Sequence, residues 1–155
     1  MALQDSLTDL QAQVGKEIHV SDWLEITQDM VNAFGKATGD MQWIHTNPER
    51  AATESPYKTT IAHGYFTLSL YPQLRNLVDE STPIFPGVKN VINYGLNKLR
   101  FPAPVPVGSR IRARCELISA AEVKNSIELI EKYSVEVEGQ ERPACIAEAV
   151  MRLYY

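Results

Sequence analysis

An acid and a base stand five residues apart in the segment Asp40-Met41-Gln42-Trp43-Ile44-His45. The ordinary pKa values of these two side chains, roughly 3.9 and 6.5, let one accept a proton while the other donates one near neutral pH. Hydration of a 2-enoyl thioester needs that division of labour, because the water loses a proton and C2 gains one. Since five residues reach roughly 17 Å when extended, the pair works only if a turn brings Asp40 and His45 together. Without such a turn, the two are a capping aspartate and a surface histidine.

The dipeptide His63-Gly64 opens an apolar, helical stretch and is the second chemical signal. Free N–H groups at a helix N-terminus attract negative charge, and a residue without a side chain lets a carbonyl approach its N–H closely. Gly64 is therefore a candidate oxyanion donor, or else a tight entry into the helix. His63 fits a core or capping histidine better than a catalytic one. Asp40, His45 and His63 lack the spacing of a metal motif, so no metal is expected.

Five basic residues lie between positions 98 and 114 with no acidic residue among them. One interpretation is a strip that holds the phosphates of a pantetheine carrier. The other is a solvated face of a strand. The residues are Lys98, Arg100, Arg110, Arg112 and Arg114, of which Lys98, Arg100 and Arg112 are the candidate phosphate contacts.

The first half of the chain reads as helices that position the acid–base segment. Thr27 is a candidate N-cap, followed by apolar residues at helical spacing up to Ala37, and Gly39 ends this helix. Asp40 therefore sits just past a helix end. Pro48 opens a short helix. A longer buried helix runs from His63-Gly64 to Val78, with a kink expected near Pro72 because proline lacks an N–H.

The second half reads as strands joined by short loops, which predicts antiparallel pairing. One long buried helix followed by long strands indicates an α+β fold in which a curved sheet wraps the helix. The predicted strands are Val88–Phe101, Arg110–Ala121, Ser126–Glu138 and Ala144–Tyr154.

Length and composition suit one domain, residues 1–155, in a chain that is 45% hydrophobic and 22% charged. The formal net charge of −4 argues against nucleic acid as the main partner. No stretch approaches the roughly 18 apolar residues of a membrane span. The N-terminal residues lack the basic start of a secretory signal, so a cytoplasmic location is expected and no membrane partner.

These motifs, taken in order, resemble the MaoC-like (R)-specific enoyl-CoA hydratases of the hot-dog fold. Within that family the sequence resembles the subgroup that includes nodulation protein N-like proteins. The resemblance covers roughly residues 15–155. It is carried by Gly39-Asp40, Gln42-Trp43-Ile44-His45, Asn47-Pro48-Glu49-Arg50-Ala51, Thr60-Ile61-Ala62-His63-Gly64-Tyr65 and Asn93-Tyr94-Gly95-Leu96-Asn97-Lys98.

The resemblance implies a homodimer with a long central helix, acting on an acyl-CoA thioester without metal or organic cofactor. It implies that Asp40 and His45 bind the reactive water and that Gly64 supplies an oxyanion N–H. The implied reaction converts a trans-2-enoyl-CoA to an (R)-3-hydroxyacyl-CoA, or the reverse. Two alternatives keep the fold: an acyl-CoA thioesterase, and a non-catalytic subunit that binds acyl thioesters.

One departure from the family pattern falls in the acid–base loop. Many members have Asn and Pro where this chain has Gln42 and Trp43. Gln42 keeps an amide, one methylene longer. Trp43 adds bulk that would narrow or reshape the acyl pocket. Because the acid–base pair is intact, we expect this departure to change chain-length preference rather than activity.

Overall fold

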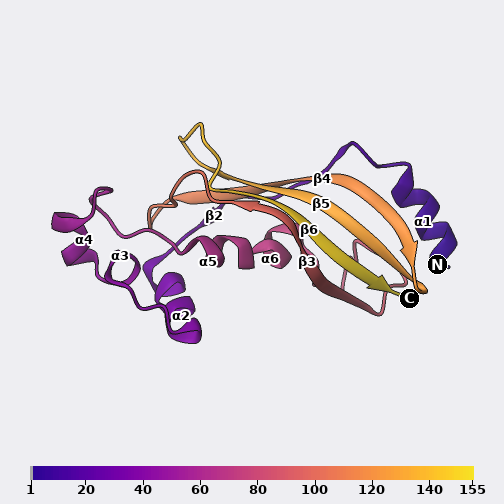
Figure 1. Cartoon of the computed structure of the whole chain (residues 1–155), viewed down its shortest axis with the longest axis horizontal. Coiled ribbons are helices and arrows are strands. Elements are labelled where there is room, and N and C mark those ends of the chain that lie inside the picture. Colours follow the sequence, from indigo (N-terminus) through magenta and orange to yellow (C-terminus); the bar gives the residue numbers. More distant parts are fainter. Residues whose placement is uncertain (1) are drawn as a thin grey trace.

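A six-stranded antiparallel sheet curves around the central helical segments, as Figure 1 shows. The structure, a computed structural model, describes residues 2–155. Helices α2, α3 and α4 gather at one end of the molecule, while α1 and the C-terminus lie at the other (Figure 1). The helices are α1 (Leu3–Gln11), α2 (Gln28–Thr38), α3 (Trp43–Thr46), α4 (Pro48–Glu54), α5 (Gly64–Ser69) and α6 (Tyr71–Arg75). The strands are β1 (Glu17–Val20), β2 (Leu24–Glu25), β3 (Asn90–Arg100), β4 (Arg110–Val123), β5 (Ser126–Val137) and β6 (Cys145–Tyr154).

The four long strands lie within two residues of their predicted bounds, and all of their pairings are antiparallel, as expected. Their order is β1-β4-β5-β6-β3, with β2 also paired to β4. Alternation is clear in β4, where Ile111, Ala113 and Cys115 are fully buried while the arginines between them face outward. The predicted α+β, hot-dog architecture is confirmed.

The central helix is present but divided into α5 and α6 at Leu70. Pro72 has no N–H to donate to the preceding turn, which explains the break and confirms the expected kink. The prediction that the helix runs to Val78 is wrong, because α6 ends at Arg75. Asn76 there adopts a left-handed conformation with φ 60°, which terminates the helix.

The helix before the acid–base segment forms as predicted. The Thr27 side chain accepts a hydrogen bond from the Met30 N–H and caps α2. At the other end Gly39 has φ 81°, the left-handed geometry that glycine adopts without strain. The chain therefore leaves α2 abruptly at Asp40, and a short excursion brings it back in α3.

One core joins the sheet, the central helices and α1. Met1, which belongs to the predicted domain, lies outside the described residues. None of the helices within residues 2–155 combines the length and apolar character needed to cross a membrane.

Candidate active site

Asp40, His45 and His63 meet at the end of the molecule where α2, α3 and the start of α5 come together. The one-turn helix α3 supplies the turn that the sequence requires, and it brings His45 back toward Asp40. A carboxylate oxygen of Asp40 and one ring nitrogen of each histidine all lie within 4.8 Å of one another. The predicted convergence of the acid and the base is therefore present in the structure.

The His45 ring is held in one tautomer. Its Nδ1 lies 2.7 Å from the main-chain oxygen of Ile61, so Nδ1 carries the proton and donates it. In the neutral ring Nε2 then has a free lone pair. The side chain is buried, with 8% of its residue surface exposed, and this burial lowers the pKa of His45 despite the hydrogen bond to Ile61. His45 is thus a neutral base with its acceptor nitrogen available.

Asp40 is the exposed member of the group, with 54% of its side chain accessible. Its Oδ1 accepts a long hydrogen bond of 3.4 Å from the Gln42 N–H. Its main-chain oxygen accepts a shorter one, 2.9 Å, from His63 Nε2. Gly35 of α2 leaves room for this loop, since a Cβ there would lie 2.9 Å from the Asp40 main-chain oxygen.

A cavity of about 260 Å³ opens beside His45. Gly64, the first residue of α5, lines it, and its N–H meets no acceptor among residues 2–155. The Phe101 ring lies over Gly64, so a Cβ at position 64 would approach Phe101 Cδ2 to 2.7 Å. The remaining lining comes from Tyr57, Ile61, Ala62, Thr67, Phe101, Pro102, Ala103, Pro104, Val105 and Ala144.

A family model for the MaoC like domain matches residues 9–139. The chain belongs to the MaoC-like family. Within it, 3-hydroxyacyl-thioester dehydratase Z of Mycobacterium tuberculosis is 50% identical over 149 residues, 96% of this chain and 95% of that protein. Nodulation protein N of Rhizobium leguminosarum bv. viciae is 38% identical over 150 residues, 92% of this chain and 87% of that protein. The solved (R)-hydratase from A. caviae covers 88% of this chain and 97% of its own, with TM-score 0.67 and 26% identity. The resemblance noted in the sequence is confirmed.

The residues that depart from the usual MaoC-like loop lie outside the cavity lining. Trp43 packs against Arg50, whose guanidinium carbon is 4.4 Å from the centre of a Trp43 ring. It is not among the residues that line the His45 cavity, so its bulk does not narrow that space. Gln42 occupies the N-cap position of α3 without a side-chain capping bond.

The five cations of the predicted strip separate into two groups in this MaoC-like fold. Lys98 and Arg100 lie on β3, whereas Arg112 lies on β4, and strands β5 and β6 run between them. Arg112 also donates to Glu136 at 2.7 Å and stacks on Trp23 at 4.4 Å. Sequence spacing did not show these partners, because Glu136 lies on β5 and Trp23 lies just before β2.

The three candidate ligands are poorly arranged for a metal ion. The rings of His45 and His63 stack, with centroids 3.9 Å apart and planes inclined by 26°. An imidazole lone pair lies in the plane of its ring, so two nearly parallel rings do not aim their lone pairs at one ion roughly 2.0 Å from each. The His63 Nε2–H and His45 Nδ1–H are moreover committed to main-chain oxygens.

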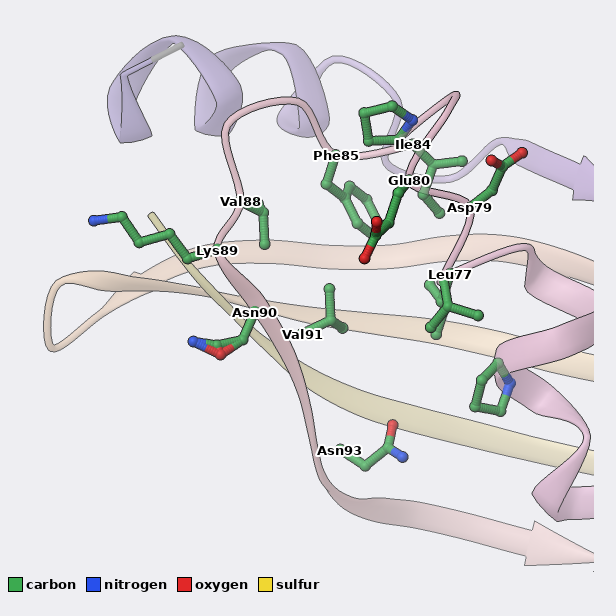
Figure 2. A pocket seen from close by; sticks show the side chains of 13 residues that line it. Leu77, Asp79, Glu80, Ile84, Phe85, Val88, Lys89, Asn90, Val91 and Asn93 are labelled. Atoms are coloured by element: carbon green, nitrogen blue, oxygen red, sulfur yellow. The ribbon is translucent and has the colours of Figure 1, made fainter.

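A second, larger cavity of about 350 Å³ lies between the loop after α6 and the start of β3. Figure 2 shows Leu77, Phe85, Val88 and Val91 around this space, with Lys89 extending away from it. Two acids line it, Asp79 and Glu80, and Asp79 already accepts hydrogen bonds from Ser81 and Thr82. No histidine lines the cavity, so it lacks an acid–base pair of the kind formed by Asp40 and His45.

Sequence reasoning missed the hydrogen bonds by which neighbouring residues hold the main chain of the site in place. Gln28 donates from Nε2 to the His45 main-chain oxygen at 2.7 Å, and its Oε1 accepts from the Thr60 hydroxyl at 2.6 Å. His63 stands at the N-cap position of α5, yet its side chain makes no capping bond and contacts Asp40 instead. The sequence signal that could have identified Gln28 was its own polar side chain, which stands within α2 on the side that faces the interior.

Proposed function

We propose that this MaoC-like enzyme is a 3-hydroxyacyl-thioester dehydratase in which Asp40 and His45 together hold the reacting water. The observation that carries the proposal is the committed tautomer of His45, whose Nδ1–H is bonded to Ile61 while the ring lies beside the Asp40 carboxylate. The relatives named as a dehydratase and an (R)-hydratase support the same reaction.

The two acceptors orient the water for attack. A water that donates one hydrogen to His45 Nε2 and the other to the Asp40 carboxylate spans about 4.5–5 Å with two ordinary hydrogen bonds. A ring nitrogen of His45 and a carboxylate oxygen of Asp40 lie within 4.8 Å of each other, and a separation of this size suits such a bridge. Both hydrogens are then engaged, and an oxygen lone pair is left to attack C3 of the enoyl thioester.

The remaining steps balance the proton and the charge. As the C3–O bond forms, one of the two bases takes a proton from the water, and the C2=C3 electron pair moves toward the thioester carbonyl. In this proposal the N–H of Gly64, which meets no acceptor among residues 2–155, stabilises the resulting negative oxygen. The base that took this proton then delivers it to C2, which completes the 3-hydroxyacyl thioester, with the (R) configuration that the family resemblance implies, and returns both side chains to their starting state. Dehydration runs through the same steps in reverse.

The test compares substitutions in the pair with matched changes elsewhere. Asp40→Asn and His45→Ala are each expected to lower turnover of crotonyl-CoA roughly 10²–10⁴-fold, measured as loss of enoyl-thioester absorbance. Asp79→Asn and His19→Ala make the same chemical changes outside the site and serve as controls. Wild-type turnover in either site variant, with the fold intact, refutes the assignment.

Two further readouts separate hydration from the alternatives. Hydrolysis by a thioesterase releases free CoA, which a thiol-reactive dye detects, whereas hydration releases none. Binding without any turnover by the wild-type enzyme would indicate a non-catalytic subunit. Gly64→Ala is expected to lower turnover as well, since its methyl group would collide with Phe101 and displace the oxyanion donor.

The carrier phosphates are proposed to bind near Lys98 and Arg100. These two residues line a groove of about 760 Å³ with Pro102, which also lines the His45 cavity. The groove therefore offers cations next to the entrance of the cavity. Arg112 is the weaker candidate of the three, because its Glu136 partner must be displaced first.

A homodimer built through β3 is part of the proposal. This strand ends the sheet, is exposed along most of its 11 residues and presents Ile92, Tyr94 and Leu96 to solvent. A long edge strand with exposed apolar side chains is a template for pairing with another chain. A second copy is its expected partner. The cytoplasmic location stays a prediction.

A further inference from the structure

His63 contacts both members of the proposed acid–base pair. Its ring stacks on His45, with 3.9 Å between centroids, and its Nε2 donates to the Asp40 main-chain oxygen at 2.9 Å. Phe34 closes the site from the side, 5.0 Å from the His63 ring centre. We propose that His63 is a positioning residue for the hydration reaction, which holds the Asp40 main chain so that the carboxylate stays beside His45. This inference rests on the proposed function.

The Asp40 carboxylate has little else to hold it. Its side chain is 54% exposed, and its contacts among residues 2–155 are the 3.4 Å hydrogen bond from Gln42 and a 4.0 Å approach to His63 Nε2. Where the carboxylate lies is therefore decided mainly by where the Asp40 main chain lies. The hydrogen bond from His63 acts directly on that main chain.

Helix α2 provides the opposite wall. At Gly35 a Cβ would approach both the Asp40 main-chain oxygen and Met41 Sδ to 2.9 Å, and His63 Cε1 to 3.6 Å. The Asp40 carbonyl is thus held between the backbone of α2 and the edge of the His63 ring. A side chain at position 35 would push the carbonyl away from this place.

Packing alone does not account for a histidine at position 63. The residue is 3% exposed, and its Nδ1 is buried without a hydrogen-bond partner within the described chain. An unpaired buried acceptor costs free energy that an apolar ring would not. The Nε2–H, which reaches Asp40, is the feature that a phenylalanine or leucine at this position lacks.

Two amide substitutions test the role of that N–H. In His63→Gln the amide nitrogen reaches about as far as Nε2, whereas in His63→Asn it reaches only as far as Nδ1. We expect His63→Asn to lower kcat for crotonyl-CoA hydration about 10- to 100-fold with little change in KM, the usual effect of misplacing a catalytic group by about an ångström. His63→Gln is expected to recover most of that loss. Thermal unfolding of both variants checks that they fold.

Equal turnover in the two amide variants, at any level, overturns the inference. If neither variant folds, His63→Phe decides, since it keeps the ring and lacks the N–H. The inference then requires His63→Phe to show the same fall in kcat as that expected for His63→Asn. A wild-type kcat in His63→Phe overturns the inference.

The Asp40→Asn background separates this inference from the proposed function. If His63 acts through Asp40, His63→Asn causes no further loss when Asp40 is already replaced. Additive losses overturn the positioning role while leaving the acid–base pair in place. Wild-type turnover in Asp40→Asn itself refutes the proposed function instead, whatever the His63 variants do.

Discussion

Replacing Arg75 with methionine should destabilise the protein strongly, because it strips a buried carboxylate of its counter-charge. Glu131 is fully buried on β5, and Arg75 of α6 donates to it from Nε at 2.9 Å and from Nη2 at 3.0 Å. Tyr71 also donates its hydroxyl to Glu131. Burial and the neighbouring Glu131 charge raise the pKa of Tyr71, so the hydroxyl keeps its proton. Arg75 and Tyr71 thus bind the α6 part of the central helix to strand β5 through Glu131.

The expected loss in the free energy of unfolding depends on which buried groups each substitution leaves without a partner. Removing one partner of a buried ion pair costs about 3–5 kcal/mol. For a chain of this length that corresponds to a fall in Tm of about 6–20 °C, at roughly 2–4 °C per kcal/mol. The double variant Arg75→Met with Glu131→Leu removes both charges and should recover part of the loss. It leaves the Tyr71 hydroxyl with only Met151 Sδ, 3.7 Å away, which costs about 1–3 kcal/mol.

Urea unfolding followed by tryptophan fluorescence measures these differences, since the chain holds only two tryptophans. An unchanged slope against urea shows that the same surface unfolds in each variant. A loss below about 1 kcal/mol in Arg75→Met contradicts the reasoning. So does a double variant less stable than the single one.

Two further outcomes are expected. Burial lowers the pKa of His45 below 6.5, and a base must be neutral, so kcat/KM should rise with pH through a midpoint below 6.5; a midpoint above that value contradicts the role of His45. The double variant Tyr94→Lys, Leu96→Lys should sediment as single chains where the wild type sediments as pairs, because like charges would face each other at the β3 edge. An unchanged sedimentation rate, or a wild type that is already a single chain, contradicts pairing through β3.

The parts that sequence predicts well are those governed by neighbours along the chain. Thr27 and Gly39 bound α2 because capping and left-handed geometry are properties of the local residues. The strands follow from alternation and short loops. Convergence of Asp40 and His45 was a hypothesis from the sequence, and it depends on a single local turn, α3.

The parts that sequence did not predict depend on partners far along the chain. Arg112 looks free in the sequence, yet its Glu136 partner lies 24 residues later on the adjacent strand. His63 looks like a core or capping histidine, and it is indeed buried, yet the sequence does not show its contact with the Asp40 loop 23 residues earlier. The central helix was expected to reach Val78, because apolar spacing continues past the point where Asn76 turns left-handed. None of these distances can be read from spacing alone.

The site divides into a half that several hydrogen bonds hold and a half that few hydrogen bonds hold. His45 is tied to the segment before α5 by its own bond to Ile61, by the bond from Ile61 N to Ile44 O at 3.0 Å, and by the Gln28 amide that joins it to Thr60. Several hydrogen bonds therefore connect the base to the segment that leads to the Gly64 donor.

Asp40, by contrast, is linked to this segment by the hydrogen bond from His63, and its side chain is 54% exposed. Gln42 and Trp43, the residues that depart from the family pattern, belong to the Asp40 half and lie outside the cavity lining. Substitutions in that loop are therefore expected to change how the water is held, leaving the oxyanion donor and the tautomer of His45 as they are. Their effect should appear in kcat rather than in which acyl chain is accepted.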